Sequence, residues 1–196
     1  MGGWPASDVS VRDWVVGHQA AALVHFFAFV SRIGVPRDMY LLAAAGAIAV
    51  WRKGVRRGAA GVALSALGAV VAYETLKRLV GRARPPGLGL VSEAGTYSFP
   101  SAHATASAAV CAALAYVCWR EGFVNRFWAV ALGAGVPALV GTSRVYLDAH
   151  WASDVVAGWA VGALIAAMCV SPYERQRRWA GAAAELPSSP HDQEAR

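Results

Sequence analysis

The sequence predicts an all-α, polytopic integral membrane protein whose chain crosses the bilayer six times as a six-helix bundle. Hydrophobic residues make up 57% of the chain and charged residues 15%, whereas soluble domains carry roughly 25% charged residues. Six apolar stretches approach the ~20 residues that a helix needs to cross a ~30 Å hydrocarbon core. The predicted spans are residues 14–31, 38–51, 59–80, 102–119, 127–143 and 152–170.

The first span is the least regular of the six. His18, Gln19 and His25 interrupt it, and the acidic segment 8–13 before it favours an interfacial amphipathic turn. The acidic start also argues against a signal peptide, which begins with basic residues. The other five spans are runs of Ala, Val, Leu and Gly with few or no charges. Small residues of this kind let helices pack closely in lipid.

Two regions follow from this reading. Residues 1–172 form the predicted membrane domain, and residues 173–196 form a polar cytoplasmic tail that contains Pro187 and Pro190. We expect the tail to be disordered, because a polar segment buries too little apolar surface to fold. The sequence does not determine the oligomeric state and is compatible with a homo-oligomer.

The positions of the basic residues predict the orientation. Nine of them lie in the loops or flanks on one side of the predicted spans: Arg52, Lys53, Arg56, Arg57, Arg120, Arg126, Arg175, Arg177 and Arg178. Four lie on the other side once the motif cations described below are set aside: Arg32, Arg37, Arg78 and Arg82. By the positive-inside rule the first side is cytoplasmic. With six spans, both termini are then cytoplasmic and the motifs face outward.

The net charge of +6 raises the question of nucleic acid as a partner. The basic residues are divided among helix ends and do not line one face, so membrane topology explains them better. We therefore expect a lipid bilayer and no nucleic acid as the partner of this surface.

Three short motifs carry the chemistry of the sequence. They are Lys77 with Arg84-Pro85, then Pro100-Ser101-Ala102-His103, then Ser143-Arg144 with His150 and Asp154. Together they supply three cations, two imidazoles, a hydroxyl and a carboxylate. That set can hold a phosphate and stabilise the charge that develops when its ester bond breaks.

The second motif has the pattern of a helix N-terminus. Ser101 follows a loop rich in Gly and Pro and precedes an apolar run, so it is the predicted N-cap. The free N–H groups of a helix start bind anions readily. A capping serine alone would indicate only a helix start, but His103 in the same first turn favours a functional site.

The third motif places His150 four residues before Asp154, so the two side chains share a helix face. A carboxylate that holds Nδ1–H of a histidine leaves Nε2 as an oriented, more basic nucleophile. An isolated pair of this kind more often ties a loop to a helix. Beside Ser143 and Arg144 the functional interpretation is preferred.

The cations complete the predicted site. Lys77 and Arg84 are seven residues apart, about two helical turns, and can face one place. Arg144 adds a planar fork that suits two phosphate oxygens. We interpret Arg78 and Arg82 as snorkelling residues at the end of the third span.

The order and spacing K-x6-R-P, P-S-x-H and S-R-x5-H-x3-D resembles the type 2 phosphatidic acid phosphatase superfamily. The resemblance covers roughly residues 59–170. It implies that His150 forms a phosphohistidine, that Asp154 orients it, and that His103 protonates the leaving oxygen. The same resemblance implies that five residues bind the phosphate: Lys77, Arg84, Ser101, Ala102 and Arg144. Ala102 departs from the glycine common in the family, which predicts a tighter but working pocket.

Three alternatives were weighed against this hypothesis. His103, His150 and Asp154 could form a two-histidine, one-carboxylate metal site, but three nearby cations would repel a metal ion. A vanadium haloperoxidase would use the same residues, yet the apolar spans favour a lipid substrate. A phosphate-binding transporter or channel without turnover is the alternative from a different class. We expect neither a metal nor another cofactor.

The resemblance narrows the substrate to a lipid phosphate without identifying it. An outward-facing site fits undecaprenyl diphosphate, a lipid of cell-wall synthesis, and the compact chain favours this isoprenoid diphosphate slightly. Phosphatidylglycerophosphate, phosphatidic acid and a prenyl-phosphosugar are the alternatives. The excess of 16 Arg over 2 Lys suggests a GC-rich bacterium and hence the bacterial inner membrane.

Overall fold

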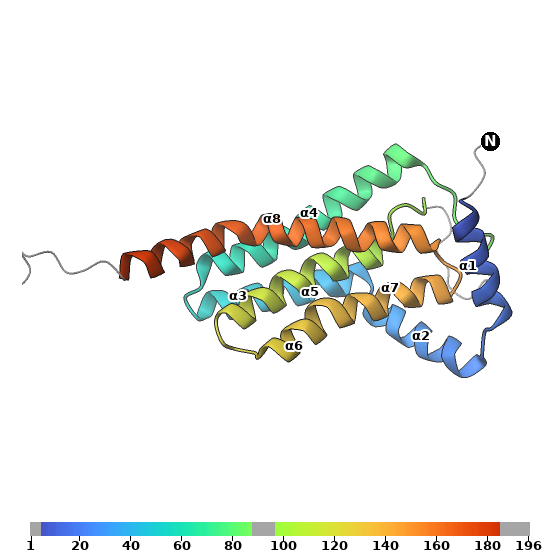
Figure 1. Ribbon diagram of the computed structural model, residues 1–196. Coiled ribbons are helices and arrows are strands. Elements are labelled where there is room, and N and C mark those ends of the chain that lie inside the picture. The colour runs from blue at the N-terminus through green and yellow to red at the C-terminus, as the bar shows by residue number, and fades with distance from the viewer. Residues whose placement is uncertain (1–4, 88–96, 185–196) are drawn as a thin grey trace, which may run out of the picture.

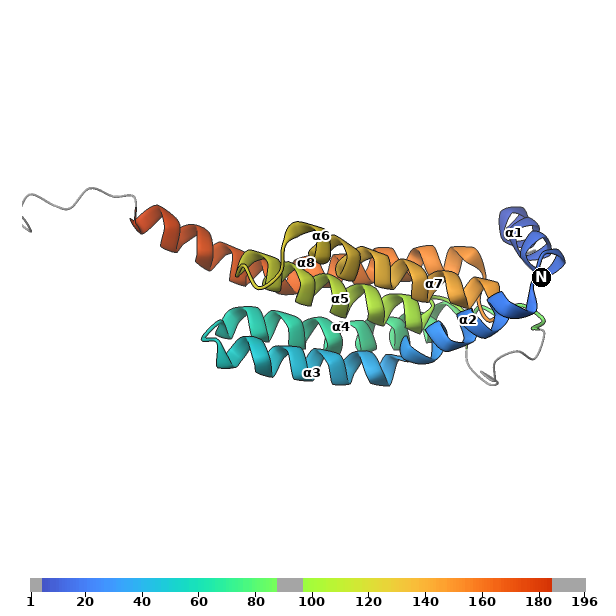
Figure 2. The ribbon, with the colours of Figure 1, turned by 90° about the horizontal axis from the view of Figure 1, so that it is seen from below.

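The computed structural model describes residues 5–87 and 97–184, and this part of the chain is helical without strands. The elements in order are α1 (Ala6–Gly17), α2 (Ala21–Ile33), α3 (Pro36–Arg52), α4 (Arg56–Val80), α5 (Ala102–Arg120), α6 (Arg126–Val130), the π-helical turn η1 (Ala131–Gly135), α7 (Val136–Tyr146) and α8 (Ala152–Ala184). The elongated bundle packs around α5, which contacts α3, α4, α7 and α8 and has buried residues along most of its length (Figures 1 and 2).

The membrane spans differ in number from the six predicted. Within the described ranges, four helices are long and apolar enough to cross a membrane, or five if α2 and α3, bent by 49° at their junction, form one broken span. The predicted first span instead covers the end of α1, a break and most of α2. With 13 residues, α2 alone reaches only about 20 Å. His18 and Gln19 coincide with the break, whereas His25 lies within α2.

Helix α1 does not run along the bundle but lies across one of its ends (Figure 1). The first described residues therefore lie at that end, whereas α8 extends beyond the opposite end. The prediction of two cytoplasmic termini requires an even number of spans, so it agrees with four spans and not with five.

The C-terminal region is more ordered than the sequence predicted. Helix α8 continues through Pro172 to Ala184, so residues 173–184 are helical and not disordered. Contacts beyond Tyr173 account for this extension, since Arg177 donates to Glu121 and Glu174 accepts from Tyr116 at 2.9 Å. The remaining residues of the predicted tail, 185–196, lie outside the described ranges.

Close packing of α5 on α8 depends on glycine. A Cβ built on Gly162 would lie 2.5 Å from the carbonyl oxygen of Thr105, and one on Gly158 would lie 3.0 Å from that of Ser101. Backbone atoms cannot move aside as a side chain can. Small residues therefore set the distance between the two helices that carry His103 and Asp154.

Gly162→Ala is expected to destabilise the protein by about 1–3 kcal/mol, because the added methyl group forces α5 away from α8. The measurement is the thermal unfolding midpoint of the purified protein in detergent. Gly135→Ala is the matched control, since nothing lies within 4 Å of a Cβ at that position. Equal midpoints for the two variants would contradict this account of the packing.

Candidate functional site

The predicted site residues gather at the end of the bundle that α1 crosses. Helices α4 and α7 end here, and α5 and α8 begin here (Figure 1). The starts of α5 and α8 direct free N–H groups and positive dipole ends toward this region. Three motifs separated by up to 77 positions in the sequence therefore converge, because the helix ends that carry them lie at the same end of the bundle.

His150 lies beside Asp154, as the four-residue spacing predicts. Its Nδ1 is 3.5 Å from Asp154 Oδ2, and both side chains are almost completely buried. The same carboxylate oxygen accepts the backbone N–H of Trp151 at 3.0 Å and the hydroxyl of Ser98. Asp154 is thus fixed by several donors and can hold the imidazole in one orientation.

Arg84 contacts the second nitrogen of the His150 imidazole. Its Nη1 is 3.0 Å from His150 Nε2 and also donates to the carbonyl of Ala149 at 2.7 Å. A guanidinium can only donate, so Nε2 must be the acceptor and carry the lone pair. The proton of a neutral imidazole is then on Nδ1, toward Asp154. This tautomer presents Nε2 as a nucleophile.

The loop that carries His150 is tied to the end of α7. The carbonyl of Arg144 accepts the N–H groups of Ala149 at 3.0 Å and His150 at 3.2 Å. Asp148 adopts a positive φ of 54° in this turn, a conformation that aspartate tolerates better than most residues. The buried Arg144 side chain donates through Nη1 to Ser31 of α2. Arg144 therefore contributes both a charge and the anchor of the loop.

The first turn of α5 contributes the second motif. Ser101 is the N-cap, with its hydroxyl accepting from the N–H of Ala104, as the sequence predicted. The N–H of Ser101 donates to the carbonyl of Asp154 at 3.1 Å, which joins the starts of α5 and α8. Ala102 is half-buried as the first helical residue, and His103 is buried in the same turn.

Lys77 completes the set from the last turn of α4. Its Nζ donates to the carbonyl of Tyr97 at 2.6 Å, and the side chain is buried. Around the motifs, the described groups that are buried or half-buried include five basic groups (Arg12, Lys77, Arg82, Arg84 and Arg144) and three carboxylates (Asp8, Asp148 and Asp154). This excess of positive charge suits an anion. Groups of three His, Cys, Asp or Glu placed to hold a metal ion do not occur within residues 5–87 and 97–184.

Three residues of this region were not predicted as part of a site. Arg82 was interpreted as a snorkelling residue, and that is wrong, because its Nη1 donates to Asp154 Oδ1 at 2.6 Å. Ser98 contacts both His150 and Asp154, and nothing in its sequence context distinguishes it from any loop serine. Asp8 belongs to the segment expected at the interface but is buried against Arg82. For Asp8 the sequence offered one signal of a role in the site, an acidic residue ahead of an apolar stretch.

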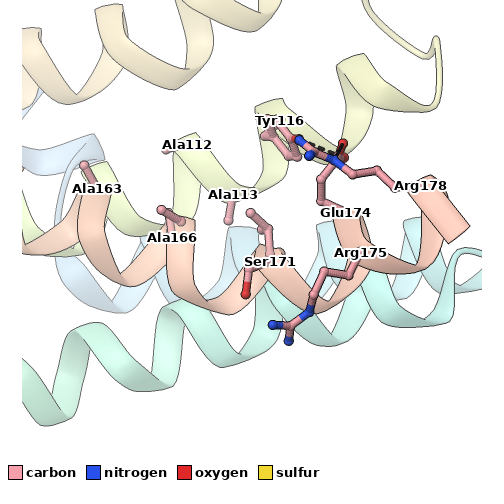
Figure 3. Close-up of a pocket in the computed structure, with 11 residues that line it drawn as sticks. Ala112, Ala113, Tyr116, Ala163, Ala166, Ser171, Glu174, Arg175 and Arg178 are labelled. Carbon is pink, nitrogen blue, oxygen red and sulfur yellow. Dashed lines mark hydrogen bonds and ion pairs between the residues drawn. The ribbon is translucent and has the colours of Figure 1, made fainter.

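A separate groove of about 510 Å³ lies toward the other end of the bundle, between α5 and α8 (Figure 3). Five of its eleven lining residues are alanines, and the side chains of Glu174 and Arg178 meet at one end. None of the predicted site residues lines this groove. Its size therefore does not locate the chemistry, which depends on the histidines at the opposite end.

Comparison with known proteins gives a consistent result. The family model described as the PAP2 superfamily matches residues 58–178. A phosphatidylglycerophosphatase B of Bacillus subtilis is 39% identical over 47% of this chain and 46% of its own. An undecaprenyl-diphosphatase of Sulfolobus acidocaldarius is 28% identical over 78% of this chain and 72% of its own. The chain thus spans about half the length of the Bacillus relative.

Among solved structures, a transmembrane PAP2-type phosphatidylglycerolphosphate phosphatase from Bacillus subtilis has a similar fold. The TM-score is 0.75 at 23% identity, over 87% of this chain and 86% of the other. At this identity the likeness concerns the arrangement of helices. It agrees with the all-helical membrane bundle described above.

Proposed function

This chain belongs to the PAP2 superfamily, and from that premise we propose that it is a membrane-bound lipid phosphatase that works through His150. The observation that carries the proposal is the contact of Arg84 Nη1 with His150 Nε2 at 3.0 Å, with Asp154 on the other side of the ring. A phosphoryl group that replaces the guanidinium at Nε2 would meet the nucleophile and a cation at once. That juxtaposition is what phosphoryl transfer to histidine requires.

The reaction has two steps. Nε2 of His150 attacks phosphorus, forming a P–N bond as the P–O bond to the leaving group breaks, and His103 donates a proton to the leaving oxygen. His103, now neutral, takes a proton from water, whose oxygen attacks phosphorus and breaks the P–N bond. Inorganic phosphate leaves, and both histidines return to their starting states. Asp154 stabilises the imidazolium character that develops on His150.

The phosphoryl oxygens would be held by charges and helix N–H groups. We assign this role to the side chains of Lys77, Arg84, Ser101 and Arg144 and to the N–H of Ala102 at the start of α5. The support is their placement at one end of the bundle and their excess positive charge. Fixed donors of this kind stabilise the charge that spreads over the equatorial oxygens in the transition state.

We propose an isoprenoid diphosphate such as undecaprenyl diphosphate as the substrate. The long match to the Sulfolobus relative supports it, as does a site covered by one short helix, α1, with no large headgroup-selecting domain among the described residues. Phosphatidylglycerophosphate is the second candidate, because the Bacillus relative of higher identity bears that name.

We propose that the site faces the extracytoplasmic side of a bacterial plasma membrane. The α3–α4 turn, the α5–α6 turn and the end of α8 carry the basic clusters, and all three lie at the end opposite the site (Figure 1). The positive-inside rule makes that end cytoplasmic. On this proposal α1 lies on the outer side and the end of α8 on the inner side.

The proposal predicts inorganic phosphate release by the purified protein in detergent. In a panel of undecaprenyl diphosphate, phosphatidylglycerophosphate, phosphatidic acid and a prenyl-phosphosugar, we expect the first to be hydrolysed fastest. Activity should survive EDTA, because fixed cations hold the phosphate. Orthovanadate should inhibit, because it adopts the five-coordinate geometry of the transition state.

A His150→Ala preparation, purified in parallel, controls for contaminating phosphatases. Binding of these lipids without phosphate release would favour the transporter or channel alternative and overturn the proposal. Faster release from phosphatidylglycerophosphate would select the second candidate and leave the mechanism intact.

A further inference from the structure

Helix α1 is fastened to the site through two buried ion pairs. Asp8 is 2% exposed on a helix whose other residues are mostly exposed. Its Oδ1 accepts the N–H of Ser153 at 2.9 Å, and its Oδ2 accepts the hydroxyl of Ser153 at 2.5 Å and Nη2 of Arg82 at 2.6 Å. One helical turn later, Arg12 forms a bidentate pair with Asp148 at 2.8 Å for both contacts.

Arg82 links Asp8 to the proposed catalytic pair, Asp154 and His150. Its Nη2 holds Asp8, while its Nη1 donates to Asp154 Oδ1 at 2.6 Å and to Ser153 Oγ at 2.7 Å. The guanidinium also lies 5.6 Å from the centroid of the Trp151 ring, which limits its movement. A planar fork of this kind fixes both carboxylates in one geometry.

The two oxygens of Asp154 thus have different partners. Oδ2 faces His150 Nδ1, Ser98 and the N–H of Trp151, whereas Oδ1 faces Arg82. Removing Arg82 would let the carboxylate rotate away from the imidazole. Removing Asp8 would direct the whole charge of the Arg82 guanidinium to Asp154. The Asp154 carboxylate would then bind the Nδ1 proton of His150 more weakly.

Asp8 is charged under ordinary conditions. Burial raises the pKa of its carboxyl, but hydrogen bonds from Ser153 and Arg82 and the charge of Arg82 outweigh burial and lower the pKa overall. The carboxylate is therefore available to share the Arg82 guanidinium with Asp154.

We propose that Asp8 and Arg82 are positioning residues for the Asp154–His150 pair, so that α1 contributes one positioning residue, Asp8, to the site. The inference rests on the proposed function. Asp8 lies in α1 and Asp154 in α8, and the relay Asp8–Arg82–Asp154–His150 connects them with charged hydrogen bonds at each of the first two steps.

The test compares Asp8→Asn with Arg12→Gln, assayed with p-nitrophenyl phosphate so that lipid binding does not enter. Each variant removes one buried ion pair of α1, but only Asp8 reaches Asp154 through Arg82. We expect Asp8→Asn to lower kcat by roughly 10- to 100-fold with KM nearly unchanged, as is usual for residues that orient a functional group. Arg12→Gln should keep kcat within about twofold of the parent while lowering the unfolding midpoint similarly.

A coupling measurement separates positioning from damage to the fold. In an Asp154→Asn background the Asp8→Asn change should have little further effect on kcat, because its target is gone. If Asp8→Asn lowers kcat by the same factor in both backgrounds, or if Arg12→Gln lowers kcat as much as Asp8→Asn does, the proposal is overturned. If Asp8→Asn does not fold, Ser153→Ala takes its place, since Ser153 Oγ bridges Asp8 and Arg82.

Failure of the positioning role and failure of the proposed function give different results. A parent protein that releases no phosphate from any substrate contradicts the phosphatase proposal itself. An active parent whose Asp8→Asn variant has the same kcat contradicts only the positioning role of Asp8 and Arg82.

Discussion

His150→Ala is expected to abolish phosphate release from every substrate, with a fall in kcat on the order of 10⁴-fold or more, because it removes the nucleophile. No phosphoenzyme should form even with a good leaving group. The measurement is steady-state phosphate release together with trapping of radiolabelled protein.

His25→Ala provides the matched control for this change. His25 is an exposed histidine whose Nδ1 contacts the carbonyl of Ala21 within α2, away from the motifs. It should keep the activity of the parent. Retained turnover in His150→Ala at a level near that of the control would contradict the assignment of the nucleophile.

His103→Ala is expected to fail in a different way. Loss of the general acid should slow lipid hydrolysis roughly 10²- to 10⁴-fold. p-Nitrophenyl phosphate has an acidic leaving group that needs little protonation, so His150 should still be phosphorylated. Hydrolysis of the intermediate needs His103 as base, and a single burst of p-nitrophenol without steady turnover should follow. Equal turnover of both substrate types would contradict this role.

Much of the site was predictable because its signals are local. The predicted spans 59–80 and 102–119 agree closely with α4 and α5, since uninterrupted apolar runs bounded by cations and a capping serine mark helix ends. The four-residue spacing of His150 and Asp154 predicted their proximity, although His150 lies in the loop just before α8 and not in the helix itself. Ser101 is the cap for the same local reason.

The remaining features depend on long-range contacts that no local pattern encodes. Arg82 has the sequence context of a snorkelling residue, and its partner Asp8 is 74 positions away. The course of α1 across the site follows from contacts with distant residues: the ion pairs Asp8–Arg82 and Arg12–Asp148 and the hydrogen bond from the N–H of Ser153 to Asp8. Apolar runs in the sequence also indicated two spans, residues 14–31 and 38–51, where the structure has α2, which is too short to cross alone, bent against α3.

In the proposed reaction the phosphoryl group passes through Nε2 of His150. This step is tested by rapid quenching of His103→Ala with radiolabelled p-nitrophenyl phosphate, followed by proteolysis and identification of the labelled peptide. We expect an acid-labile, base-stable phosphohistidine at position 150. Covalent phosphate trapped in His150→Ala but not in His103→Ala would reverse the two roles and contradict the claim.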